Sequence, residues 1–517
     1  MTAATVAFTL NGAPVQVPAA GSLLDALREA LAIRSAKDGC SPQGQCGCCT
    51  VWIDGQPRVA CVTQVGRVAG RSVTTIEGLA DAREWGQSFA DHGGSQCGFC
   101  TPGIVMRAAA LTEDQRRRPE AVKQAMLAHL CRCTGWQTVV ESVIGVGVDA
   151  NVGRRQAPVD PSASAARARI EGGAAQVVGP QIALGSGGFA DDQAPPDALV
   201  ALRRMDGEWV IGESLAEARA LSRKVQGRRT TLPLTWPLEV PPGDWARTLR
   251  TTWVEPAYLE PDASWCAPGG EPASPLANGG AFGGKAASDV GRVARELADR
   301  HGRVVRVIAT REDVVRHGAK RPPIAAGVGA DGRGVIRVAR TPGIAAAISG
   351  YAPSFDVEEV DVAGPPTSTA LRGAGWAEAA VLLASLGGGP EWQVRSPNRS
   401  SAVAHVDGND GSVHVRVRCG RALDPVVLLS YCIGAAHMAL GWVRSEGLAI
   451  DEQGVPVDLT IRSFGILRAV DTPQIEIEIE DDDGEPVNGS DAVFAAVATA
   501  AWAATGWHET WPTNRGV

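Results

Sequence analysis

The chain has 517 residues, of which 21% are charged and 44% hydrophobic, and its formal net charge is −8. This length exceeds the size at which a single hydrophobic core stops growing, so several domains are expected. The negative balance and the lack of a basic stripe argue against nucleic acid as a partner. No stretch approaches the roughly 18 uninterrupted apolar residues of a membrane helix, so the sequence predicts a cytoplasmic protein without a membrane segment.

Residues 1–80 predict a small domain of strands and one helix. Asn11-Gly12 separates two short apolar strands, and this pair favours the tight primed turn of a β-hairpin. Ser22 precedes a segment with apolar residues at helical spacing, and residues 50–54 indicate another strand. This order of elements fits a β-grasp, ferredoxin-like domain.

Four cysteines of this segment follow the spacing C-x5-C-x2-C-x11-C: Cys40, Cys46, Cys49 and Cys61. The first gap is one residue longer than in the plant-type [2Fe–2S] pattern. The loop 39–47 is rich in small residues, which suits a backbone that wraps closely around sulfide and donates N–H groups to it. The spacing predicts an iron–sulfur cluster, with Cys48 as a spare thiol.

A second cysteine set lies in residues 81–149, which predict a mostly helical domain. Pro102 marks the expected start of one of its helices. The set consists of two pairs separated by about thirty residues: Cys97 with Cys100, and Cys131 with Cys133. Two helix ends must therefore converge on one metal centre, and two centres in one chain indicate an electron relay.

Two other interpretations of the cysteines stay open. Zinc also binds CxxC pairs, although a glycine-rich first loop and a distant fourth ligand are unusual for it. Disulfides need an oxidising compartment, and the first twelve residues contain neither a basic region nor a long apolar region. Cys266, Cys419 and Cys432 are isolated and are predicted to be small buried residues.

Three strings in residues 1–148 point to a known family: QCGCCTV (45–51), QCGFCTPG (96–103) and CRCTGW (131–136). They resemble the iron–sulfur subunit of the molybdenum hydroxylases, the xanthine dehydrogenase and aldehyde oxidase family. The resemblance implies a plant-type [2Fe–2S] cluster on the first cysteine set. It also implies a second [2Fe–2S] cluster in the helical domain, nearest the pterin, with Gln96 beside it as a cofactor-binding residue.

The remaining chain resembles the molybdopterin subunit of the same family in a shortened form. Residues 150–180, rich in Pro, Ala and Ser, predict a linker. Residues 181–265 are then expected to be a reduced hammerhead-like region, and residues 266–517 a truncated molybdopterin-domain-like region. The overall expectation is an α+β multidomain fold that ends in a reduced αβ part.

Several short matches carry this second resemblance. GGAFGGK (279–285) is similar to the glycine-rich loop that passes close to the molybdenum, and RGAGWAE (372–378) to a further active-site loop. VEPAYLEP (254–261) and the stretch 420–473 also match. Glu485 falls where the family places its catalytic base, which makes it, Gly283 and Arg372 the candidate residues of a molybdenum site.

Several departures from the family pattern weaken the case for a molybdenum site in this chain. Only about 340 residues follow the linker, and 46 residues separate Arg372 from Cys419, where the family inserts a large domain half. Tyr431 takes the place of a glutamine that contacts the cofactor, and acidic residues 481–483 precede Glu485 in place of small ones. These departures favour a retained packing turn at 279–285 and a solvated acidic turn at Glu485.

Three functions remain. The first is an electron-transfer subunit of a molybdenum hydroxylase complex, with molybdopterin on a catalytic partner subunit, FAD on another, and an assembly such as a dimer of heterotrimers. The second is a compact, self-contained molybdenum hydroxylase of N-heterocycles or aldehydes that uses Glu485 as base. The third treats the C-terminal half as a non-redox assembly module.

Overall fold

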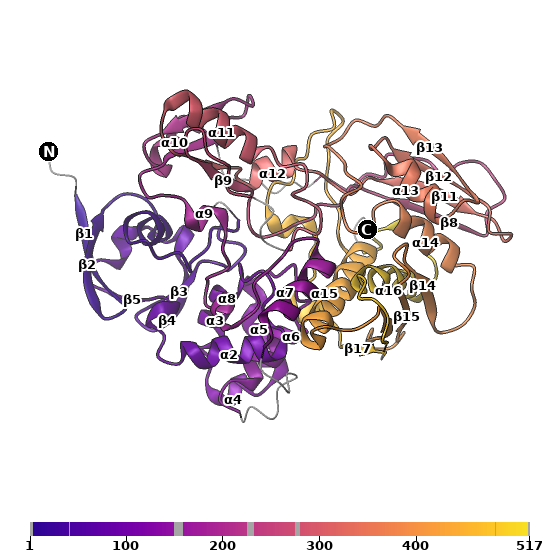
Figure 1. Cartoon of the computed structure of the whole chain (residues 1–517), viewed down its shortest axis with the longest axis horizontal. Coiled ribbons are helices and arrows are strands. Elements are labelled where there is room, and N and C mark those ends of the chain that lie inside the picture. The colour runs from indigo at the N-terminus through magenta and orange to yellow at the C-terminus, as the bar shows by residue number, and fades with distance from the viewer. Residues whose placement is uncertain are drawn as a thin grey trace.

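The computed structural model describes residues 4–40, 42–148, 159–224, 232–274, 280–480 and 482–514. Within these residues the chain forms four β-sheets with accompanying helices. The N-terminal sheet lies at one end of the molecule, the two C-terminal sheets lie at the other end, and a helical region lies between them (Figure 1). The predicted α+β multidomain fold class is confirmed.

The first sheet contains five short strands: β1 (Thr5–Leu10), β2 (Ala13–Pro18), β3 (Thr50–Ile53), β4 (Gln56–Val59) and β5 (Ser72–Thr74). Their order is β2-β1-β5-β3-β4, and β1 pairs with β5 in parallel. Asn11 and Gly12 both have positive φ, 50° and 85°, as the predicted primed turn requires. Ser22 caps the short helix α1 (Leu23–Asp25), which continues as a π-helical turn, Ala26–Ala30.

Five helices form the second unit: α2 (Ala82–His92), α3 (Thr101–Ala108), α4 (Glu113–Arg116), α5 (Pro119–Ala125) and α6 (Gln137–Gly145). Helix α2 packs against α6, and its Trp85 and Phe89 are fully buried. Pro102 stands in the first turn of α3, as predicted. The helical domain expected around the second cysteine set is therefore present.

Part of the predicted linker 150–180 is a packed helix. Helix α7 (Pro161–Gly172) lies against the long helix α15 (Pro425–Arg444). Its Arg167 and Glu171 are fully buried and form an ion pair at 2.8 Å. The linker prediction is wrong for this segment, because buried polar partners hold it against the C-terminal half. Residues 149–158 lie outside the described residues.

The second sheet contains β6 (Leu199–Arg203), β7 (Trp209–Gly212), β9 (Ala263–Cys266) and β10 (Val305–Ile308) in the order β7-β6-β10-β9. Helices α10 (Leu215–Ser222) and α11 (Val290–His301) pack on it. The predicted boundary between residues 265 and 266 falls inside β9. The boundary is misplaced because β9 pairs with a strand about forty residues later in the chain.

Two further sheets form the C-terminal half. The third sheet contains β8 (Arg247–Thr251), β11 (Ile324–Val328), β12 (Gly334–Ala339), β13 (Phe355–Val360) and β18 (Thr510–Trp511). The fourth sheet contains β14 (Trp392–Arg395), β15 (Ser401–Val406), β16 (Val413–Arg418) and β17 (Ile475–Ile479). The helices of this half, besides α15, are α12 (Arg311–His317), α13 (Ile344–Tyr351), α14 (Trp376–Ala384) and α16 (Ser490–Ala504). Strand β17 pairs only with β16 and is an edge strand.

Helix α15 is the central core element of this half. It packs along α16, whose residues 492–502 are all buried, as the apolar sequence predicts. Among the described helices, α15 alone is long and apolar enough to cross a membrane, with a mean hydropathy of 1.7 over 18 residues. That window is wholly buried inside the protein. A core helix accounts for both the length and the composition.

Candidate metal centres

The first cysteine set meets in one buried place. The Sγ atom of Cys40 accepts hydrogen bonds from the thiols of Cys46 and Cys61, and Cys61 also donates to Cys49. The backbone N–H groups of Gln43 and Gln45 donate to Cys40 Sγ, each at 3.4 Å. Four converging thiols and two N–H···S bonds are the donor set and the loop geometry that suit a [2Fe–2S] cluster.

Glycine lets the loop approach this set closely. A Cβ atom on Gly39 would lie 3.1 Å from Cys46 Sγ, which is tighter than most real contacts. Cys48, the predicted spare, is fully buried and turns its thiol toward the carbonyl of Cys46 at 3.9 Å. The three isolated cysteines, Cys266, Cys419 and Cys432, are buried as predicted.

The second cysteine set also converges. Cys133 Sγ lies 3.5 Å from Cys97 Sγ, and Cys100 donates a hydrogen bond to Cys131. Cys100 stands at the N-terminus of α3, and the other pair precedes α6 by a few residues. The two helix ends therefore meet at one point, as the sequence predicts. The set fits the same cluster chemistry as the first.

A backbone hydrogen bond joins the two sets. The N–H of Leu130, next to Cys131, donates to the carbonyl of Cys46 at 3.0 Å. Gly103 of α3 packs so closely on this loop that a Cβ atom there would lie 2.3 Å from the carbonyl oxygen of Gly47. The two sets are thus neighbours across one polypeptide contact.

Gln96 lies beside the second set. Its side chain is buried and donates to the carbonyl of Cys133 and to Ser430 Oγ of α15, each at 3.0 Å. Helix α15 approaches the same loop at Gly434, where a Cβ atom would lie 1.8 Å from the carbonyl oxygen of Cys133. The core helix of the C-terminal half therefore packs directly against the second set.

The glycine-rich loop reaches the second set as well. A Cβ atom on Gly280 would lie 2.8 Å from Cys133 Sγ and 3.8 Å from Cys97 Sγ. Gly279, the first residue of the motif, lies outside the described residues. In this chain the loop covers the sulfur atoms of two expected cluster ligands.

The two loops that the resemblance assigns to a molybdenum site contact each other. The N–H of Arg372 donates to the carbonyl of Phe282 at 3.0 Å, and a Cβ atom on Gly283 would lie 1.7 Å from the carbonyl oxygen of Ala370. The cavity between them measures about 40 Å³. Cofactor pockets commonly measure about 300–1,000 Å³. A pterin does not fit between these loops.

Charged and aromatic side chains fill the space around that cavity. Arg321 forms an ion pair with Glu378 at 2.7 Å, and its guanidinium lies 4.0 Å above the ring of Trp442. Arg372 lies 3.9 Å above the ring of Phe282 and forms an ion pair with Asp491 at 3.0 Å. These contacts tie the loops to α14 and α16.

The third candidate residue, Glu485, and the substituted position Tyr431 do not line this cavity. Glu485 is exposed on the turn after β17, where neighbouring Asp482 pairs with Arg418 at 3.0 Å. Tyr431 is buried, and its hydroxyl donates to Gln176 at 3.2 Å. The first finding matches the predicted solvated turn, apart from Asp481, which lies outside the described residues.

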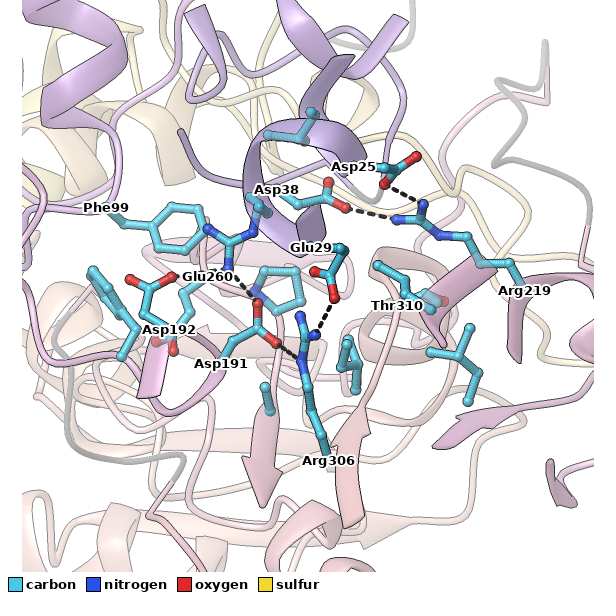
Figure 2. Close-up of a pocket in the computed structure, with 18 residues that line it drawn as sticks. Asp25, Glu29, Asp38, Phe99, Asp191, Asp192, Arg219, Glu260, Arg306 and Thr310 are labelled. Atoms are coloured by element: carbon cyan, nitrogen blue, oxygen red, sulfur yellow. Dashed lines mark hydrogen bonds and ion pairs between the residues drawn. The ribbon is translucent and has the colours of Figure 1, made fainter. Parts of the chain in front are cut away.

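A cluster of charges around two buried arginines, Arg28 and Arg306, joins the ferredoxin-like domain to the second sheet, as Figure 2 shows. Asp191 accepts from Arg28 and from Arg306, both at 2.7 Å, and Arg306 also pairs with Glu29 at 2.9 Å. Burial alone would raise the pKa of Asp191, but the charges of Arg306 and Arg28 outweigh it and lower that pKa. The cluster fixes the domain that carries the first cysteine set.

Comparison with known proteins places these domains. Residues 3–77 match the family described as "2Fe-2S iron-sulfur cluster binding domain", and residues 75–144 match "[2Fe-2S] binding domain". The chain is 35% identical over 147 residues to the xanthine dehydrogenase iron-sulfur-binding subunit of Escherichia coli O157:H7, covering 27% of this chain and 92% of that protein. It is 40% identical over 148 residues to the aldehyde oxidoreductase of Megalodesulfovibrio gigas, covering 26% of this chain and 16% of that protein.

The fold likeness extends further than the sequence likeness. The structure of the aldehyde oxidoreductase from Desulfovibrio gigas aligns with a TM-score of 0.70 at 15% identity, across 98% of this chain and 99% of that chain. The corresponding enzyme from Desulfovibrio desulfuricans aligns with a TM-score of 0.69 at 14% identity, across 96% and 97%. The remaining chain shares the fold of these aldehyde oxidoreductases. Through its two iron–sulfur domains, the chain belongs to the molybdenum hydroxylases, a family of oxidoreductases.

Proposed function

We propose that this chain is the electron-transfer component of a cytoplasmic molybdenum hydroxylase complex. It passes electrons from a molybdopterin centre on a partner chain to a flavin on another partner. The observation that carries the proposal is the hydrogen bond from Leu130 to the carbonyl of Cys46, which joins the two cysteine sets. Bound [2Fe–2S] clusters supply one-electron carriers, and the eight cysteines of the two sets would hold them.

The surroundings of the cysteines support a relay. All cysteines except Cys97 are buried, and burial keeps water from the sulfur atoms. His129, packed between the sets, has its pKa lowered to about 3 by burial and is therefore neutral at pH 7. The loop 43–45 is half-buried and lies next to Val62, a residue that is 58% exposed. Electrons would leave the chain at this loop.

The close packing of the loops around Phe282 and Arg372 supports the view that a partner chain carries the molybdopterin. A complex of this kind needs a source and a sink for electrons, and the space between Phe282 and Arg372 does not accept a pterin. The C-terminal half then serves assembly, with the partner chains completing a hetero-oligomer such as a dimer of heterotrimers. Gln96 would help to position the second cluster through its hydrogen bond to Cys133.

The fold likeness to complete aldehyde oxidoreductases favours one other candidate, a compact hydroxylase that binds its own molybdopterin. Metal analysis of the isolated full chain separates the two. The electron-transfer role predicts about four iron atoms per chain, as two [2Fe–2S] clusters require, without molybdenum. One molybdenum atom per chain would establish the compact hydroxylase, and zinc in place of iron would overturn both.

A further inference from the structure

The small cavity between the loops around Phe282 and Arg372 has polar walls. It measures about 40 Å³ and is lined by Arg132, Glu255, Arg321, Arg372, Trp442 and Phe494, among others. A single water needs about 10–15 Å³ of such volume, so the cavity has room for about three water-sized groups. It therefore accepts a molecule of three or four heavy atoms and excludes an aromatic ring system.

Three buried N–H groups of these walls have no hydrogen-bond partner among the described residues: Arg321 Nη2, Arg372 Nε and Trp442 Nε1. Arg372 Nε forms an ion pair with Asp491 at 3.0 Å, which leaves Arg321 Nη2 and Trp442 Nε1 as the two donors without a polar partner among the described residues. The other nitrogens of Arg321 are engaged, Nε with Glu378 at 2.7 Å and Nη1 with the carbonyl of Arg372 at 2.6 Å. Arg321 is 7% exposed and Trp442 is 2% exposed. A buried donor without an acceptor is costly, so an occupant that accepts hydrogen bonds from both is favoured.

The geometry of Arg321 suits a planar anion. Its guanidinium is held 4.0 Å above the indole of Trp442, and its ion pair with Glu378 fixes its plane. The carboxylates near the cavity already have cationic partners: Glu446 pairs with Arg132 at 2.6 Å, and Glu255 pairs with Lys320 at 3.0 Å. Each of these two acidic groups is therefore paired with a cation, although Glu255 Oε1 accepts no hydrogen bond from the described residues.

We propose that this cavity binds one small planar oxyanion, a carboxylate or nitrate-type group, through Arg321 Nη2 and Trp442 Nε1. This proposal goes beyond the electron-transfer role and does not depend on it. The site also touches the relay, because Arg132 lies between two expected cluster ligands and lines the cavity. An added negative charge there disfavours the reduced state of the second cluster and lowers its potential.

Calorimetric titration of the full chain with sodium formate and with sodium nitrate tests the proposal, with sodium chloride at matched ionic strength as reference. We expect saturable binding of one formate or nitrate per chain, with a change in the EPR signal of the second cluster only. Trp442→Phe removes the indole N–H and should weaken binding about tenfold, because the anion loses one of its two hydrogen-bond donors.

Trp209→Phe is the matched control. Trp209 on β7 also lies under an arginine, with Arg203 at 4.8 Å, but it does not line the cavity. This variant should bind formate and nitrate as the parent chain does. If Trp442→Phe does not fold, Arg321→Lys keeps the charge beside Glu378 and removes the second guanidinium nitrogen, with the same expected loss. Heats equal to those of chloride would show that the cavity holds only water, and equal weakening by both tryptophan variants would place the anion elsewhere; either result overturns the proposal.

Discussion

Arg132 and Glu446 form a two-pronged ion pair, at 2.6 and 2.8 Å, between the second cysteine set and the end of α15. The side chains are only 4% and 1% exposed. Arg132 stands between Cys131 and Cys133, so the pair holds the loop of expected cluster ligands against the C-terminal half. A third hydrogen bond, from Arg132 Nε to the carbonyl of Pro256, fixes the guanidinium plane.

Breaking this pair should cost much more than breaking an exposed one. Glu446→Gln leaves a buried cation without its counter-charge, and we expect a loss of about 3–5 kcal/mol in the free energy of unfolding. The control is Glu391→Gln, which breaks the exposed pair with Arg416 at 2.8 Å and should cost at most about 1 kcal/mol. Urea unfolding of both variants checks this, and similar losses would contradict a structural role for the buried pair.

The contact of Gly280 with Cys133 predicts a selective effect on one cluster. Gly280→Ala places a methyl group 2.8 Å from Cys133 Sγ, so we expect the second cluster to be lost or its EPR signal to be altered. Gly332→Ala is the matched control, because its φ of 80° is close to the 87° of Gly280 and it has nothing within 4 Å. Both variants carry a similar backbone penalty of about 1–2 kcal/mol. An unchanged EPR spectrum in Gly280→Ala would contradict the contact.

The two cysteine sets predict two separate EPR signals. Cys61→Ser should abolish one signal and Cys131→Ser the other, because each removes a thiolate ligand from one set. Cys48→Ser should keep both, since the four other cysteines of this segment complete the first set and serine keeps a hydrogen-bonding group beside the Cys46 thiol. Spectra of the dithionite-reduced variants provide the measurement. Simultaneous loss of both signals in either single variant would overturn the assignment of two independent centres.

The charge cluster around Asp191 predicts an acid-sensitive domain contact. Its pKa in the folded state lies below the ordinary value of 3.8, so the unfolded chain takes up the proton first as the pH falls. The stabilisation from Asp191 is therefore fully present above about pH 4 and is lost progressively below it. Asp191→Asn should lower stability at pH 7 and flatten the profile below pH 4, whereas exposed Asp197→Asn should do neither. Thermal unfolding across pH 3–7 measures both effects.

Local sequence patterns were sufficient to predict the two iron–sulfur domains. The cysteine spacings, the Asn11-Gly12 turn and Pro102 act over a few residues, so the sequence alone locates them. The pair of Arg132 and Glu446 is separated by 314 residues, and only the packing of α15 brings the two side chains together. No spacing rule predicts such a contact. An arginine between two ligand cysteines does indicate that a buried acidic residue lies nearby, but not which one.

The same limit explains the two errors of domain organisation. The composition of residues 161–172 is typical of a linker, yet Arg167 and Glu171 find buried partners in the C-terminal half. The strand at residue 265 has a partner beyond residue 300, and a boundary drawn from composition cannot anticipate that pairing. In both places a long-range contact decided the structure.

The position of Glu485 separates the proposed role from the compact hydroxylase. A general base works best in a dry pocket that tunes its pKa toward the operating pH, and Glu485 is instead exposed on an acidic turn. Glu485→Gln should therefore leave turnover of the assembled complex nearly unchanged. Cys131→Ser in the same complex should abolish turnover, because it interrupts the relay, and thus shows that the assay depends on this chain. A loss of several orders of magnitude in Glu485→Gln, with iron content and assembly intact, would establish Glu485 as the base and the chain as a hydroxylase in its own right.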